Sequence, residues 1–199
     1  MIRNLNSTRP FLAVPPLSRP GAWAYADMME VGRMPYFVED RTMFGAWVIV
    51  SSPLILGHDV TNASQNERVW AVVANPTAIS INQAWHGHPG RFVRATKSLQ
   101  IWAKPTSATS HAAFVFHDGD NATESAEVII DLNTDLGITI PKGGMVRVRD
   151  VWSGQALTPV GALGKFKTAL IPWHDSVLLE FSSSKTGPRK RGGSSTGKR

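Results

Sequence analysis

The sequence contains no cysteine, which excludes a disulfide framework and any metal site with thiolate ligands. It has no apolar run near the roughly 18 residues that a membrane-spanning helix needs. Its start, MIRNLNSTRPFLAVPPLSRPG, is basic but lacks the unbroken apolar stretch of a signal peptide. The six histidines show no His-Glu-x-x-His spacing. We therefore expect a soluble chain with no visible export signal, no metal site and no cofactor.

The net charge of +6 comes from the C-terminal end of the chain. Six of the 21 basic residues lie in 185–199, KTGPRKRGGSSTGKR, which has no acid, so residues 1–184 hold 15 basic and 15 acidic residues. A Gly/Ser/Lys/Arg segment without apolar side chains cannot bury enough surface to offset the entropy lost on ordering. We predict a disordered basic tail over 185–199, with a nucleic-acid-binding arm as the alternative. Because the body is neutral, we expect neither nucleic acid nor a membrane as the partner.

Residues 1–90 divide into an irregular lead-in and a segment with α/β character. Four prolines fall between Arg9 and Pro20, which predicts irregular structure over 1–20. Residues 38–50, VEDRTMFGAWVIV, have two early acids and apolar residues on one helical face. The run LIL at 54–56 predicts a short strand buried on both sides. Thr61 or Asn62 can cap a second helix over 63–74, which Asn75-Pro76 ends.

After HGHPG (86–90) helical periodicity disappears and short β-rich runs follow, broken by Gly, Asp, Asn and Pro. The seven predicted strands are 91–96, 99–104, 111–117, 126–131, 145–152, 166–171 and 176–181. Seven short strands with turn signals over about ninety residues are typical of an antiparallel β-sandwich. We therefore place a domain boundary near residue 90, with the sandwich over 91–184.

Several motifs, in collinear order over about residues 20–181, resemble the C-terminal part of the glycoside hydrolases of family 27, the α-galactosidase and α-N-acetylgalactosaminidase group. They are PGAWAYADMMEVG, EDRTMFGAWVIVSSPLILGHDV, NPTAISINQ, IWAKP, VRDVWSG and HDSVLLEF. The resemblance implies a (β/α)8 TIM barrel followed by an antiparallel β-sandwich. The fold class is then α/β followed by all-β, with 21–90 as the C-terminal fragment of the barrel.

The resemblance also implies a sugar-binding site. It places Asp27 and Met28 at the C-terminal end of a late barrel strand, where active sites of this fold lie. Asp27 would accept hydrogen bonds from galactose hydroxyls, Met28 would pack against the ring, and Trp23 would form apolar wall or floor. A carboxylate that caps a turn is the structural alternative for Asp27. Members of the family read Trp-Asn-Asp-Pro-Asp-Met where this chain has WAYADM (23–28).

The residues needed for cleavage are not recognisable in this sequence. A retaining glycosidase uses two carboxyl groups about 5–5.5 Å apart. In the family the nucleophile lies in a Lys-Tyr-Asp run and the acid/base lies a few residues after an arginine, and neither run occurs here. A barrel of about 250 residues spends about 30 on each βα unit, so residues 1–90 hold two or three of the eight. We therefore assign no catalytic residue and expect this chain alone to be inactive.

Two functions of different classes remain. The first is the C-terminal portion of a secreted or lysosomal-type α-galactosidase acting on terminal α-linked galactosides, which allows a homodimer of the full-length enzyme. The second is a non-catalytic β-sandwich that binds carbohydrate or a partner protein. The choice between galactose and N-acetylgalactosamine stays open. We also expect 91–184 to be self-sufficient and 1–90 alone to aggregate through exposed barrel edges.

Overall fold

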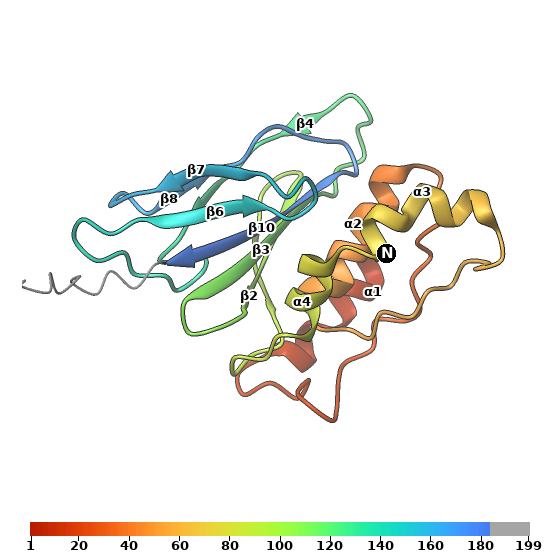
Figure 1. The fold of residues 1–199 in the computed structure, drawn as a ribbon, viewed down its shortest axis with the longest axis horizontal. Helices are drawn as coiled ribbons and strands as arrows, with labels where there is room; N and C mark the ends of the chain where they lie inside the picture. The colour runs from red at the N-terminus through yellow and green to blue at the C-terminus, as the bar shows by residue number, and fades with distance from the viewer. Residues whose placement is uncertain (184–199) are drawn as a thin grey trace, which may run out of the picture.

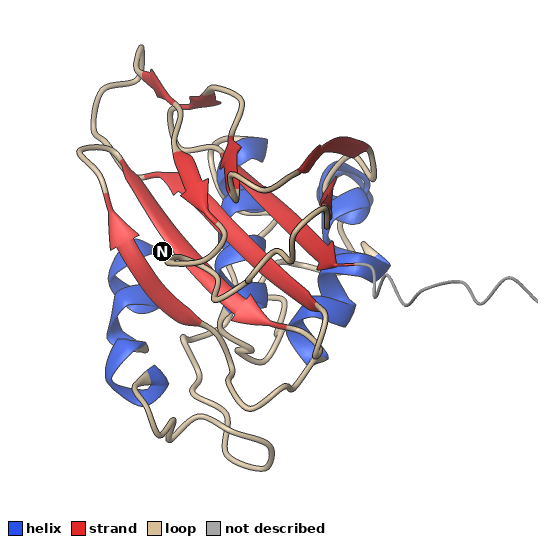
Figure 2. Cartoon of the chain, turned by 90° about the vertical axis from the view of Figure 1, so that its left-hand side faces the viewer, coloured by secondary structure: helices blue, strands red, loops and turns tan. Residues whose placement is uncertain are grey.

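A computed structural model describes residues 1–183 of the chain. Six antiparallel strands form its main sheet, in the order β1-β2-β3-β10-β6-β7 (Figures 1 and 2). Their bounds are Arg91–Ala95 (β1), Leu99–Pro105 (β2), Ser110–His117 (β3), Val146–Asp150 (β6), Ala156–Val160 (β7) and Ser176–Ser183 (β10). Two short sheets complete the β-structure, pairing β4 (Ser125–Ala126) with β9 (Ile171–Pro172) and β5 (Ile129–Asp131) with β8 (Lys165–Lys167). The predicted β-sandwich is thereby confirmed.

The central strands are apolar on both faces. In β3, Phe114 and Phe116 point to one face of the sheet, whereas Ala113 and Val115 point to the other, as expected for the two-residue repeat of a strand. The second face packs against Ile130 and other residues of the short strands. The first face packs against the helices, which gather on one side of the sheet in Figure 1.

The helices precede the sheet in the chain. They are α1 (Ile2–Ser7), the 3-10 helix η1 (Arg9–Leu12), α2 (Phe37–Ile49), α3 (Ala63–Val73) and α4 (Pro76–Gln83). The helices predicted over 38–50 and 63–74 are α2 and α3, and the side chain of Asn62 caps α3 by accepting from the backbone N–H of Gln65. Asn75 ends α3 and also caps α4, whose first residue is Pro76. The sequence analysis did not predict α4.

The structure corrects four predictions. Residues 1–20 are not wholly irregular, because α1 and η1 bury Leu5 and Leu12 in the core. The strand predicted over 54–56 is reduced to one parallel bridge between Met29 and Leu56. It is not buried on both sides, since Ile55 is 49% exposed. The strands predicted over 126–131 and 166–171 are each divided in two, and β7 was not predicted.

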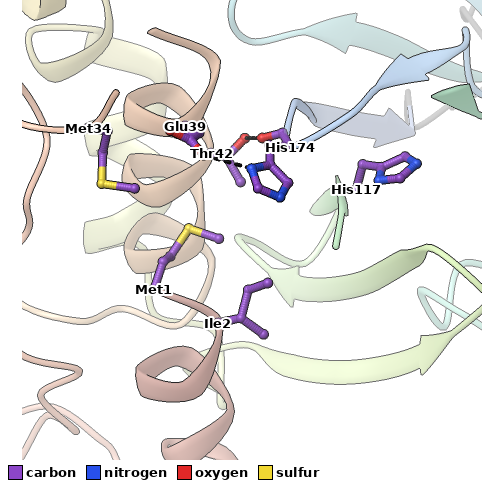
Figure 3. Close-up of a pocket in the computed structure, with 7 residues that line it drawn as sticks. All are labelled: Met1, Ile2, Met34, Glu39, Thr42, His117 and His174. Atoms are coloured by element: carbon purple, nitrogen blue, oxygen red, sulfur yellow. Dashed lines mark hydrogen bonds and ion pairs between the residues drawn. The ribbon is translucent and has the colours of Figure 1, made fainter. Parts of the chain in front are cut away.

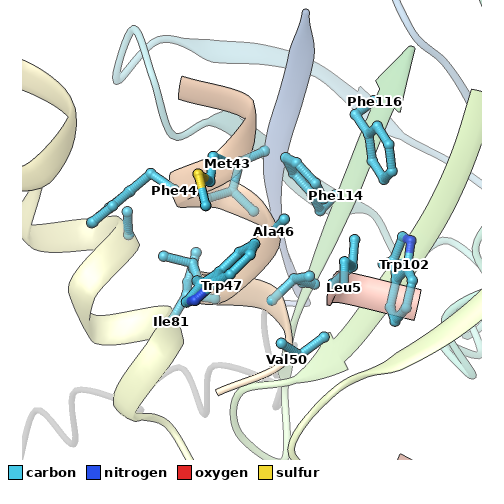
Figure 4. Close-up of a cluster of buried hydrophobic side chains, with 14 of the residues drawn as sticks. Leu5, Met43, Phe44, Ala46, Trp47, Val50, Ile81, Trp102, Phe114 and Phe116 are labelled. Atoms are coloured by element: carbon cyan, nitrogen blue, oxygen red, sulfur yellow. The ribbon is translucent and has the colours of Figure 1, made fainter. Parts of the chain in front are cut away.

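One hydrophobic core joins the helices to the sheet. Trp47 of α2 and Trp102 of β2 are fully buried in the same cluster, as Figure 4 shows. Gly45 of α2 lies so close to the ring of Phe114 that an added Cβ would lie 2.3 Å from its Cε2 atom. The boundary near residue 90 stays a prediction, and this core crosses it.

The basic tail predicted over 185–199 lies outside the described residues. Within residues 1–183, no helix combines the length and apolarity needed to cross a membrane. The same part of the chain has no cluster of three or more His, Asp or Glu side chains placed to hold a metal ion.

Candidate functional site

The segment that contains Asp27 runs beside residues 52–57. The backbone N–H of Ala26 donates to the hydroxyl of Ser52 at 3.1 Å. Two backbone bonds follow, from the Met29 N–H to the Ile55 carbonyl at 2.9 Å and from the Gly57 N–H to the Met29 carbonyl at 2.8 Å. Helix α2 lies between the two segments in the chain, so they form a parallel pair with a helical crossover.

Asp27 is exposed and its backbone is firmly held. Its φ of 78° lies in the left-handed region, which Asp tolerates better than most residues. The Oδ1 atom accepts from the Met28 N–H at 2.8 Å, and the Asp27 carbonyl accepts from the indole N–H of Trp47 at 2.7 Å. This bond joins Asp27 to its immediate neighbour, and the choice between a turn cap and a sugar ligand for Asp27 stays open. Its Oδ2 atom makes no hydrogen bond within residues 1–183 and can accept from a ligand hydroxyl.

Met28 lies beside Asp27 with its side chain 49% exposed. A Cβ added at Gly57 would lie 3.0 Å from the Met28 sulfur, so the absence of a side chain at Gly57 makes room for the thioether. Both residues precede Met29, which forms the parallel bridge. The described pairing therefore does not place them after a strand, where the family resemblance expected them.

Trp23 lines a hollow that Asp27 and Met28 do not reach. This hollow has a volume of about 360 Å³, and its lining includes Phe11 and Tyr25 but neither Asp27 nor Met28. The Trp23 ring meets Trp85 edge to face, with 5.7 Å between ring centroids. The structure thus places Asp27 beside Met28 and places Trp23 apart from them, in a hollow that neither of the two lines.

A buried carboxylate fixes the loop that follows Asp27 and Met28. Asp40 is fully buried in α2, and its Oδ1 atom accepts from the backbone N–H groups of Gly32 at 2.7 Å and Met34 at 3.3 Å. Its Oδ2 atom pairs with Arg68 of α3. In the sequence, Asp40 was notable only as an acid in the first turn of a helix. Its loop-binding role depends on the folded position of residues 32–34.

A second polar cluster joins α2 to the turn before β10. Arg41 donates to both carboxylate oxygens of Asp175 at 2.6 Å, and Glu39 pairs with His174 Nδ1 at 2.7 Å. The Thr42 hydroxyl donates to the His174 carbonyl at 2.9 Å. Glu39, Thr42 and His174 line a largely apolar cavity of about 330 Å³, and Figure 3 shows their side chains. The partners are more than 130 residues apart in sequence, so no local pattern revealed the cluster.

Lys104 of β2, which no sequence pattern indicated, forms a further polar contact between elements. Its side chain is fully buried, and Nζ donates to the Ser51 hydroxyl at 2.6 Å, to the Asn82 carbonyl at 2.7 Å and to the Ile81 carbonyl. Burial lowers the pKa of Lys104 to about 7. The carbonyls belong to the last turn of α4, where a cation is favoured. Lys104 therefore joins the sheet to α4.

Comparisons with known proteins agree with this fold. Residues 96–181 match the family described as the alpha galactosidase C-terminal beta sandwich domain. The chain is 29% identical over 134 residues to the alpha-galactosidase of Cyamopsis tetragonoloba, covering 67% of this chain and 31% of the relative. It is 29% identical over 168 residues to alpha-galactosidase A of Cellvibrio japonicus, covering 82% and 40% respectively. The chain thus spans roughly a third of the length of these relatives.

Solved structures share the fold. The alpha-galactosidase of Saccharomyces cerevisiae with raffinose superposes with a TM-score of 0.74 at 18% identity, covering 91% of this chain and 51% of that one. Alpha-galactosidase I of Mortierella vinacea gives a TM-score of 0.70 at 24% identity, covering 84% and 42%. Residues 96–181 therefore match the α-galactosidase C-terminal β-sandwich domain, and the comparisons support a chain similar to the C-terminal portion of the α-galactosidases of glycoside hydrolase family 27.

Proposed function

We propose that this chain is the C-terminal portion of a retaining glycoside hydrolase that acts on terminal α-linked galactosides. The observation that carries the proposal is the extent of the similarity. The Cellvibrio alpha-galactosidase matches 82% of the chain, whereas the sandwich domain occupies only residues 96–181. The match therefore reaches well into residues 1–95, which a free-standing sandwich would not need.

The geometry of residues 26–57 supports a barrel origin for this half. Met29 and Leu56 form a parallel bridge, and α2 connects the two segments as a crossover helix. The order along the chain is the segment at Met29, helix α2, the segment at Leu56 and helix α3. This is the order of two βα units of a (β/α)8 barrel. The exposed apolar side chains of Ile55 and Met28 are consistent with further strands packing there.

Asp27 and Met28 are the residues we assign to galactose binding. The free Oδ2 atom of Asp27 would accept a hydrogen bond from a sugar hydroxyl, while Oδ1 stays bound to the Met28 N–H. The half-exposed Met28 side chain would pack against the ring. Trp23 would contribute apolar surface from its neighbouring hollow. We assign the nucleophile and the acid/base to residues outside this chain, and we expect the 199 residues alone to be inactive.

Two measurements test this function. The coding sequence upstream of Met1 is expected to continue in frame and to encode a barrel with a Lys-Tyr-Asp run. In that longer enzyme, Asp27→Asn should lower kcat/KM for an aryl α-galactoside by about a hundredfold, since a sugar-binding charge is lost. Glu30→Gln, at an exposed neighbouring carboxylate, is the matched control and should leave kcat/KM unchanged.

Other outcomes would favour the non-catalytic sandwich. An in-frame stop directly before Met1 without a longer transcript, together with galactoside binding but no nitrophenol release, would support a binding module. Hydrolysis of an aryl α-galactoside by the 199 residues alone would contradict our placement of the catalytic carboxylates.

A further inference from the structure

A further cavity, lined by residues remote in sequence from Asp27, is surrounded by basic side chains. Its volume is about 270 Å³, and its lining includes His88, Arg91, Lys104 and His111 but no acidic residue. A water molecule in the liquid occupies about 30 Å³, so the cavity has room for a small solute with part of its hydration.

The four basic side chains come from four separate elements. His88 lies in the connection before β1, Arg91 begins β1, Lys104 lies in β2 and His111 lies in β3. Because the strands pair in the order β1-β2-β3, these positions converge at one end of the sheet. Arg91 and Ala103 are paired across β1 and β2, and Pro105 and His111 across β2 and β3.

Several nitrogen atoms around the cavity lack protein partners. Arg91 uses only Nη2, which donates to the Asp135 carbonyl at 2.9 Å within the described residues. His88 Nδ1 accepts from the Gly90 N–H at 3.1 Å. The buried Nδ1 atom of His111 has no hydrogen-bond partner in residues 1–183. Buried polar atoms of this kind normally find a partner.

The positive charge is not balanced by a nearby carboxylate. Burial lowers the pKa of His88. A hydrogen bond to the Leu12 carbonyl opposes this by raising the pKa, and the Arg91 charge lowers it further. Burial also lowers the pKa of His111, and the charge of His86 lowers it further. The neighbouring carboxylate of Asp135 is already bound by Arg94, whose Nη2 atom lies 2.9 Å from Oδ2.

We propose that this cavity is a binding site for a small oxyanion, namely phosphate or sulfate, either free or as an ester on a sugar. Arg91 supplies guanidinium N–H groups in the planar arrangement that suits oxyanions, and His111 supplies an imidazole N–H. Lys104 contributes charge only, because its Nζ atom already serves three protein acceptors. The site is independent of galactoside binding at Asp27.

Inorganic phosphate is the first probe. Titration of the full chain at pH 6 should shift the imidazole NMR signals of His111 and His88 saturably. Sodium chloride at matched ionic strength should not do so. Arg91→Gln and His111→Gln should each weaken phosphate binding about tenfold or more. Arg147→Gln, at an exposed arginine of β6 that does not line the cavity, is the matched control and should leave binding unchanged.

Proton linkage gives a second readout. Burial lowers the pKa of His88, the pKa of His111 and the pKa of Lys104, the last to about 7, so these three groups around the cavity can gain a proton as the pH falls, whereas Asp135 is paired with Arg94. A bound anion favours the protonated forms of these three groups, so sulfate, which keeps its charge over this range, should bind more tightly as the pH falls from 7.5 to 5.5. An unchanged sulfate affinity over this range would contradict the assignment to these groups.

The remaining outcomes are also decisive. Tighter binding of galactose 6-phosphate than of inorganic phosphate would identify an ester as the ligand, and equal binding would identify the free ion. Imidazole shifts no larger with phosphate than with chloride would overturn the proposal. So would equal weakening by Arg91→Gln and Arg147→Gln, since that indicates general charge attraction. Arg91→Gln also removes the hydrogen bond to the Asp135 carbonyl and could prevent folding. In that case, phosphate binding by His111→Gln tests the proposal.

Discussion

The Nζ atom of Lys104, in the second strand of the sheet, lies 2.7 Å from the carbonyl oxygen of Asn82, the penultimate residue of α4. This contact crosses the boundary that the sequence predicts near residue 90. It gives the last turn of α4 a cation and a hydrogen-bond donor at once. The helical half and the sheet are therefore joined by polar contacts as well as by the shared hydrophobic core.

Replacing Lys104 by methionine should destabilise the protein. The substitution keeps the volume of the side chain but leaves the Ser51 hydroxyl and two α4 carbonyls without a donor. We expect a loss of about 3 kcal/mol in the free energy of unfolding, measured by urea titration. Lys97→Met, at an exposed lysine, should change it by less than about 0.5 kcal/mol. Equal stability of the two variants would show that the Lys104 contacts contribute nothing.

The same residue should make stability depend on pH above neutrality. The folded pKa of Lys104 is lowered to about 7, whereas an unfolded lysine titrates near about 10.4. Between pH 7 and 9 the unfolded chain keeps a proton that the folded chain releases, so the free energy of unfolding should rise with pH. The slope should approach about 1.4 kcal/mol per pH unit and should be absent in Lys104→Met. Parallel pH profiles for the two proteins would exclude Lys104 as the source.

Gly90 should tolerate no side chain. Its φ is 117°, and a Cβ at this position would lie 1.8 Å from the Ile49 carbonyl oxygen at the end of α2. Gly90→Ala should cost more than about 4 kcal/mol or prevent folding. Gly87 is the matched control, because its φ is also positive at 77° but a Cβ there would meet nothing within 4 Å. Gly87→Ala should cost only about 1–2 kcal/mol, and similar melting temperatures for both variants would contradict the close approach.

The isolated segment 91–183 should not fold as stably as the sequence suggested. Without the helices, one face of the sheet would expose Trp102, Phe114 and Phe116, which are fully buried in the whole chain. We expect a loss of cooperative thermal unfolding and binding of a hydrophobic dye, measured on purified 91–183 and compared with the full chain. A sharp calorimetric transition at the melting temperature of the full chain would restore the original expectation of a self-sufficient sandwich.

Local patterns predicted the regular elements with strong periodicity. Helix α2 was recognisable from two early acids and an apolar face, and α3 from Asn62 and the Asn75-Pro76 stop. Strands β2, β3 and β10 stood out as apolar, β-rich runs because they are largely buried. Strand β7 was missed because its residues are largely exposed and give little apolar periodicity, whereas the strand at 54–56 was overpredicted because the apolar run LIL is partly exposed in the fold.

The amino-acid order alone specified a helix-rich first half, a β-sandwich in the second half, and a carboxylate at Asp27 within a family motif. Those properties depend on neighbours within a few residues, where steric preferences and apolar spacing act. The tertiary structure determined the arrangement of the candidate sites. Contacts between residues far apart in the chain, which no local pattern records, determine three features: the exposed position of Asp27, the separation of Trp23 from it, and the basic cavity around Arg91.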